Sequence, residues 1–296
     1  MDIWTPILIL LTAAVYGTCL AAAGTVLFRL ALHDLPRREW SLEIADGPRI
    51  AAAGLPLVPL TLAARVLFLG GGDLATLGEW AMWQFLLSGP VGESAGLRIL
   101  GLALTCAPAL LRRPRWRPTA GLAAVCGLAA IILSFTVGGH ATTPGMSLLA
   151  PLLGLHLAAI AFWIGALWPL YRLAGSLPPR NAADVMRRFG QVATMAVGLL
   201  LLAGLAMAIE LVGSVQALFA SGYGRILLAK VALVAALLGL AAGNRWRLVP
   251  ALRAAAPGAA RRLRLSILAE IGLVVLILVA TAALVTLEAA PATVGH

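Results

Sequence analysis

The chain has 296 residues, of which 61% are hydrophobic and only 11% are charged, and its mean hydropathy is +0.97. A soluble domain of this size could not hide so much apolar surface from water, so the composition excludes a soluble globular protein and indicates a membrane protein. The formal net charge of +10 would suggest a nucleic-acid partner in a soluble protein. Here the arginines fall in short clusters between apolar runs, as in loops that face anionic lipid, so no nucleic-acid partner is expected.

Apolar runs follow one another along the chain, and each is long enough to cross roughly 30 Å of hydrocarbon as a helix. They are 3–32, 49–69, 94–111, 119–138, 148–173, 188–212, 223–244 and 265–287. Helices are expected because backbone polar groups must be satisfied inside the bilayer, and no run alternates like a barrel strand. The first run lacks a positive stretch before it and a small-residue cleavage site after it, so we expect a retained helix. The sequence therefore predicts an all-α polytopic membrane protein with about eight transmembrane helices.

The connection at 73–92 is long and rich in large apolar side chains, namely Trp80, Met82, Trp83 and Phe85. It predicts an amphipathic helix on the outer surface, which either roofs a cavity or serves as a plain interfacial anchor.

Arginine sets the expected orientation. Connections rich in arginine alternate with connections at 139–147 and 213–222 that have no lysine or arginine, and neither terminus has any. The arginines of the rich connections and their edges are Arg29, Arg37, Arg38, Arg49, Arg112, Arg113, Arg115, Arg117, Arg172, Arg180, Arg187, Arg188, Arg245, Arg247, Arg253, Arg261, Arg262 and Arg264. Because positive loops stay on the cytoplasmic side, both termini are predicted to be extracytoplasmic, with an even number of helices.

A weak internal repeat divides the chain into two halves, 1–140 and 141–296. The stretch 28–36 at the end of the first run is similar to 171–178 at the end of the fifth. In each half a glycine precedes a cation by six positions, in the pairs Gly92 with Arg98 and Gly224 with Lys230. A 4+4 parallel repeat about an axis along the membrane normal would explain these similarities, and chance matching of Leu/Ala-rich helices is the alternative.

Ionisable residues inside the runs are costly and need a partner or a purpose. Lys230 is the only lysine and lies about two turns below the outer end of the seventh run. It is expected either to pair with Glu210 or to snorkel, or else to position that carboxylate so that it draws a cation inward. Near the inner face, Glu270 is expected to meet Asn244 or Arg245 as an architectural clamp.

Two histidines form the candidate metal site. His140 ends the fourth run on its outer side, and His156 lies roughly 12 Å inside the neighbouring fifth run, where Trp163 shares its face. The candidate additional ligands are Met146, Met207 and Glu210. Imidazole with thioether suits copper, especially Cu(I), and carboxylate adds tolerance for Cu(II). The alternatives are a hydrogen-bonded core histidine or, for a b-type cytochrome, a pair of axial ligands to haem b.

The order of several short motifs resembles the copper resistance D (CopD/PcoD) family of bacterial inner-membrane proteins. These motifs lie at 139–141, 156–170, 188–189, 223–230, 244–245 and 264–270, so the resemblance falls on the second half. It implies copper movement across the inner membrane toward the cytoplasm, alongside a periplasmic partner of the CopC type. It also implies that His140 and His156 are copper ligands. Structural or gating roles are expected for Lys230, Glu270, Arg245 and Trp163.

The sequence offers no sign of an enzyme. It has no GxxxxGK[ST] loop for a nucleotide, no Ser/His/Asp arrangement and no HExxH motif. Transport would therefore run downhill or be coupled to an ion gradient. The leading hypothesis is a copper transporter, and the other two are a b-type cytochrome and a non-transporting factor that delivers copper to an oxidase.

Overall fold

Each apolar run is mainly helical where the structure describes it. The computed structural model describes residues 3–33, 46–111, 113–137, 149–212 and 222–289. Six stretches within these residues are long and apolar enough to cross a membrane: Trp4–Ala31, Asp46–Leu69, Pro151–Ser176, Pro179–Leu202, Gly224–Arg253 and Ala259–Thr286. Arg117–Leu133 is apolar but shorter. The chain is a polytopic all-α membrane protein, as predicted, whereas the number eight and the 4+4 repeat stay predictions.

The first half begins with one long helix and continues in shorter ones. Its helices are α1 (Trp4–Ala31), α3 (Asp46–Gly54), α4 (Leu57–Leu69), η1 (Leu74–Gly78), α5 (Trp80–Leu87), α6 (Pro90–Thr105), α7 (Ala107–Leu110), η2 (Pro114–Trp116) and α8 (Arg117–Leu133). The second predicted run is broken between α3 and α4, because Pro56 lacks an N–H and restricts the residue before it. The predicted surface helix is present as α5, and its Trp80 and Phe85 are both exposed.

The second half consists mainly of long helices. They are α9 (Leu149–Ser176), α10 (Pro179–Val212), α12 (Gly222–Gly243), the π-helical segment η4 (Asn244–Leu248), α13 (Val249–Arg253) and α14 (Ala259–Ala289). Both α10 and α14 begin several residues before the apolar runs that predict them. The predicted connections therefore contain helix, because arginine-rich sequence at a membrane surface can continue a helix into water.

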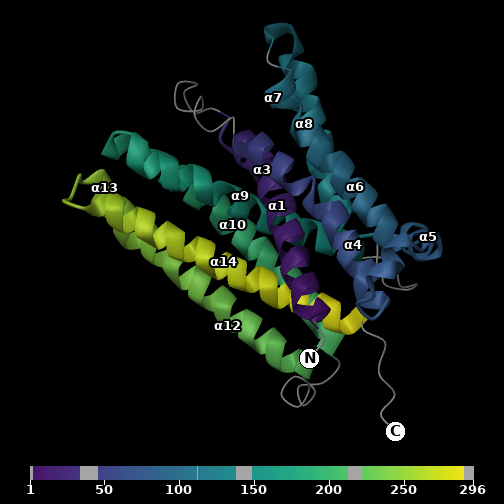
Figure 1. Ribbon diagram of the computed structural model, residues 1–296. Coiled ribbons are helices and arrows are strands. Elements are labelled where there is room, and N and C mark those ends of the chain that lie inside the picture. The colour runs from purple at the N-terminus through teal and green to yellow at the C-terminus, as the bar shows by residue number, and fades with distance from the viewer. Residues whose placement is uncertain (1–2, 34–45, 112, 138–148, 213–221, 290–296) are drawn as a thin grey trace.

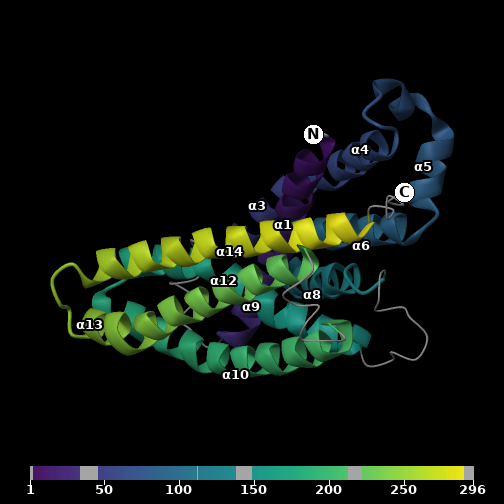
Figure 2. The same ribbon diagram turned by 90° about the horizontal axis from the view of Figure 1, so that it is seen from below.

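The helices form two groups that share α1. Figures 1 and 2 show α9, α10, α12 and α14 running together as a long bundle, while α4, α6 and α8 form a second group at an angle to it. Helix α1 lies between them and makes its most extensive contact with α9. The ends that carry the arginine-rich connections, near α3, α7 and α13, lie along one side of Figure 1.

Helices α1 and α9 cross backbone against backbone. A Cβ atom added at Gly24 would overlap the carbonyl of Ala161, and one added at Gly165 would overlap the backbone of Gly24. Ala161 and Gly165 are four residues apart, so they present one small-residue face of α9 to α1. Such faces let helix backbones approach closely, which gives dispersion contacts that lipid does not replace.

This crossing joins the two hydrophobic cores of the protein. Phe28 of α1 and Leu32, which follows its last residue, are buried in the core of the second half, together with residues of α9, α10 and α14. Leu157 and Ala161 of α9 are buried in the core of the first half, together with residues of α1, α4 and α6. Each half therefore contributes side chains to the core of the other.

A buried ion pair also links the halves near the arginine-rich side. Asp46 at the start of α3 is 6% exposed, and its carboxylate accepts a hydrogen bond of 2.7 Å from Arg172 of α9. Arg49 lies 3.6 Å from the same carboxylate but is mostly exposed. The Arg172 contact is thus the stronger of the two, because it is shorter and better shielded from water.

We expect Asp46→Asn to lower stability by about 2 kcal/mol. This is less than the loss for a fully buried pair, because the Arg172 side chain remains 31% exposed. The measurement is the apparent melting temperature of the purified protein in detergent. Glu79→Gln, which removes one exposed carboxylate, is the control and should leave it unchanged. Equal melting of the two variants would contradict the prediction.

Candidate functional site

His156 is held against α10 by a hydrogen bond to the backbone. Its Nδ1 lies 3.3 Å from the carbonyl oxygen of Leu200, and the ring is partly buried. A carbonyl oxygen can only accept, so Nδ1 carries the proton of this hydrogen bond and Nε2 of the neutral ring keeps a lone pair. A backbone carbonyl that fixes one nitrogen while the other stays free is the usual support of a metal-bound imidazole.

The face of α10 near Gly204 lies beside the imidazole. A Cβ added at Gly204 would lie 3.5 Å from Cε1 of His156 and 3.8 Å from its Nδ1. The ring is therefore in van der Waals range of the helix backbone as well as hydrogen-bonded to it. Two neighbouring turns of α10 thus fix the direction of Nε2.

A cation from a third helix also acts on His156. Lys230 on α12 lies close enough for a charge on its amino group to act on the imidazole. The structure therefore brings together His156 and Lys230, which the sequence analysis assigns to the metal site and to a structural or gating role. A positive charge near an imidazole opposes the arrival of a second cation, so this proximity bears directly on metal affinity.

The other predicted ligands lie outside the described part of the structure. His140 and Met146 fall outside the described residues, and α10 includes Met207 and Glu210, whose side chains are not described. Among the described residues, no group of three or more His, Cys, Asp or Glu side chains could hold a metal ion. The proposed ligand set and the pairing of Lys230 with Glu210 therefore stay predictions.

A second polar cluster lies toward the arginine-rich ends of the same helices. Glu270 of α14 is only 4% exposed, and its Oε1 accepts a hydrogen bond of 2.5 Å from Nδ2 of Asn244. This is one of the two contacts that the sequence predicts for Glu270. Arg245, the other predicted partner, instead donates hydrogen bonds to the Gly190 carbonyl and to Thr194 of α10.

The π-helical segment that positions Asn244 is not among the elements predicted from the sequence. Residues Asn244–Leu248 form wider turns between α12 and α13. Pro250 supplies the reason, because its ring cannot donate to the carbonyl of Trp246 and would clash with it in a regular α-helix. Widening the turn avoids the clash, and such insertions are frequent at functional sites. The proline was the signal in the sequence.

Arg98 is part of the predicted repeat, and the structure gives it aromatic partners that were not predicted. Its guanidinium lies over two aromatic rings, 5.3 Å from the centroid of Tyr16 on α1 and 4.8 Å from that of Phe135. In both halves, then, a cation on the third predicted span acts on a ring of the first span. This agrees with the predicted duplication without testing it.

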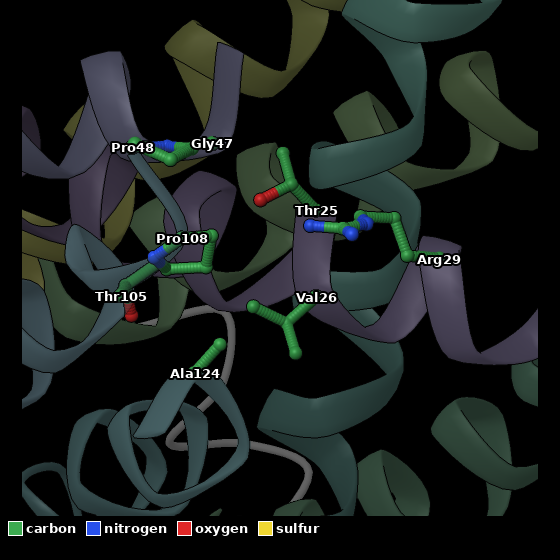
Figure 3. A pocket seen from close by; sticks show the side chains of 8 residues that line it. All are labelled: Thr25, Val26, Arg29, Gly47, Pro48, Thr105, Pro108 and Ala124. Atoms are coloured by element: carbon green, nitrogen blue, oxygen red, sulfur yellow. The ribbon is translucent and has the colours of Figure 1, made fainter. Parts of the chain in front are cut away.

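A small cavity lies in the first half, away from His156 (Figure 3). Its volume is about 20 Å³, which suits about one water molecule. The lining residues are Thr25, Val26, Arg29, Gly47, Pro48, Thr105, Pro108 and Ala124. These side chains include no imidazole and no thioether, so the cavity does not match the predicted copper chemistry.

Comparison with known proteins supports the predicted family over part of the chain. Residues 183–284 match the model of the CopD family, copper resistance protein D. The chain matches no curated protein and no solved structure. The matched residues include Lys230, Asn244 and Glu270, but α9, which carries His156, lies before them.

Proposed function

We propose that this membrane protein, whose residues 183–284 match the model of the CopD family, binds copper in the outer half of the bundle and moves it toward the cytoplasm. The family connects the chain with copper resistance. The observation that carries the proposal is the orientation of His156: its Nδ1 faces the Leu200 carbonyl, which leaves Nε2 available to a metal ion within a membrane-spanning helix.

The proposed ligand set is His156 with His140, Met146, Met207 and Glu210. Imidazole and thioether together favour Cu(I), which tolerates the low coordination numbers that a few side chains can offer. Helical spacing supports Met207 as an additional ligand, because it follows Gly204 by three residues and so shares its face of α10, and Glu210 in turn follows Met207 by three. Gly204 is the point where α10 lies beside the imidazole.

Lys230 suggests how copper would be released rather than trapped. A positive charge on Lys230 would raise the cost of a cation bound at His156, and the carboxylate of Glu210 would offset it. A transport site needs moderate affinity, since an ion that binds too tightly does not leave. We therefore assign Lys230 to tuning affinity.

The proposed location is the bacterial inner membrane, with both termini in the periplasm. Support comes from the arginine-rich connections, which the positive-inside rule places in the cytoplasm. Copper would then enter from the periplasmic side, with a copper-binding protein of the CopC type as donor. Membrane lipid surrounds the exposed apolar side chains, such as Leu202 and Val275.

The test is copper uptake by the purified protein in lipid vesicles. Cu(I) should accumulate in vesicles that contain the protein and not in protein-free vesicles. Binding without flux would instead support the delivery factor, and a red protein with a Soret absorption band would support the b-type cytochrome. The absence of both copper binding and copper flux would overturn the proposed function.

A further inference from the structure

Glu270 occupies a dry position inside the second bundle. It is 4% exposed on α14, and the aromatic cluster of Phe162, Trp163 and Phe189 belongs to the same core. An ionised carboxylate in such surroundings is costly unless it is well compensated by hydrogen bonds or opposite charge. The hydrogen bonds and charges around Glu270 therefore determine whether its carboxyl group is protonated.

Two buried polar atoms near this carboxyl group lack a hydrogen-bond partner among the described residues. One is Oδ1 of Asn244, whose Nδ2 donates to Glu270, and the other is Nε1 of Trp163. The Trp163 N–H lies within reach of the Glu270 carboxyl group, in a contact too long or too bent to count as a formed hydrogen bond. Orphaned buried polar atoms cost roughly 1–3 kcal/mol each, so their occurrence beside one carboxyl group calls for an explanation.

We propose that Glu270 is a proton-binding site that alternates between two hydrogen-bonded states. When Glu270 takes a proton from water, its new O–H donates to Oδ1 of Asn244, while Nδ2 of Asn244 still donates to the other carboxyl oxygen. When it returns the proton to water, the carboxylate accepts the Trp163 N–H instead. Each state thus satisfies one of the two atoms that lack a partner.

The π-helical segment connects this site with the arginine-rich side of the membrane. Asn244 is its first residue, and Trp246, two residues further on, is 73% exposed. An exposed tryptophan beside Arg245 and Arg247 is typical of the boundary between hydrocarbon and water. Protons would therefore enter and leave past Asn244 rather than through the apolar length of α14.

Among the described residues, no positively charged side chain is paired with Glu270 to stabilise its ionised form. The groups that act on its carboxyl are Asn244 and Trp163, both uncharged. Arg245 is hydrogen-bonded to α10, Arg264 to Tyr171, and Lys230 acts on His156. Besides Glu270, the titratable and charged groups on the elements packed against α14, and on α14 itself, are Tyr16, Cys19, Arg29, His156, Tyr171, Arg172, Tyr223, Arg225, Lys230, Arg245, Arg247, Arg253, Arg261, Arg262, Arg264 and Glu288.

The link to transport rests on the proposed copper function. His156 and Trp163 lie two turns apart on the same face of α9, so the proposed copper site and the proton site face the same side of this helix. A proton released from Glu270 as copper passes would compensate the positive charge of the copper ion. The proton site itself does not depend on copper and can be tested without it.

The test is infrared difference spectroscopy of the purified full-length protein, without copper, as the pH is changed. We expect a carbonyl band of a protonated carboxylic acid that shifts in D₂O, disappears as the pH rises, and is absent from Glu270→Gln. Asn244→Leu should move the band of wild-type protein, because the acid loses its amide partner. Glu79→Gln, which removes an exposed carboxylate, should leave it unchanged.

Three outcomes would overturn the proposal: no such band, a band that persists in Glu270→Gln, or a band indifferent to Asn244→Leu. If Glu270→Gln does not fold, the Asn244→Leu shift and the D₂O shift decide. A second arm measures Cu(I) uptake under an imposed pH gradient. If the band is present but copper does not move, the proton site stands and only the proposed copper function fails.

Discussion

Replacing His156 with alanine should weaken Cu(I) binding by about a hundredfold or more. The expectation follows from its position, because Nδ1 is committed to the Leu200 carbonyl and only Nε2 can hold the ion. Loss of a supporting partner alone commonly costs 10–100-fold in metal affinity, so loss of the ligand should cost at least as much. The measurement is competition with a Cu(I) chelator of known affinity, followed by uptake into vesicles.

Two further variants separate a ligand from a structural residue. His156→Phe keeps the ring volume against Gly204 and should bind copper as poorly as His156→Ala. His33→Ala removes an exposed histidine beyond the end of α1 and should bind like the wild type. Wild-type affinity in both His156 variants would disprove the site.

Lys230→Met should change the same affinity in the opposite direction. Removing the positive charge that acts on His156 should tighten Cu(I) binding about fivefold, which corresponds to about 1 kcal/mol of relieved repulsion. If binding tightens while uptake slows, Lys230 serves release. Weaker binding would show that Lys230 helps to build the site.

The second large effect concerns stability. Gly24→Ala should destabilise the protein by about 3 kcal/mol or more, at the upper end of overpacking effects. The added methyl group would overlap the Ala161 carbonyl, and the crossing of α1 and α9 cannot relax without opening both cores. The measurement is the melting temperature and the yield of monodisperse protein in detergent.

Gly239→Ala on α12 is the matched control. It is also a helical glycine, but a Cβ there would meet nothing within 4 Å. The change should be neutral or slightly stabilising, because alanine favours a helix by roughly 1 kcal/mol over glycine. If the Gly24 and Gly239 variants melt together, close approach at the crossing is not what stabilises the fold.

Much of the fold was predictable because lipid restricts the backbone to few choices. Runs such as 3–32 and 223–244 match α1 and α12 almost to the residue, since hydrophobic length alone sets a spanning helix. The errors occur where charge or proline enters: α10 extends into arginine-rich sequence, and Pro56 divides the second run. The local composition does not predict how far a helix continues beyond the membrane into water.

The candidate site was predictable only in part. Asn244 and Glu270 lie on runs joined by one connection, so their meeting follows from topology. The Leu200 carbonyl that holds His156 did not follow, because a backbone acceptor has no signature in side-chain pattern. The same holds for the placement of Arg98 over Tyr16, which depends on how two helices cross.

The shared helices have a consequence for how this chain can be divided. The segment 183–284, recognisable as a family, starts inside α10 and omits both α1 and α9. Those two helices supply Phe28 and Phe162 to the interior that the segment would need. The segment that matches the family is thus shorter than the unit that folds. A gene trimmed to that segment should yield an insoluble product.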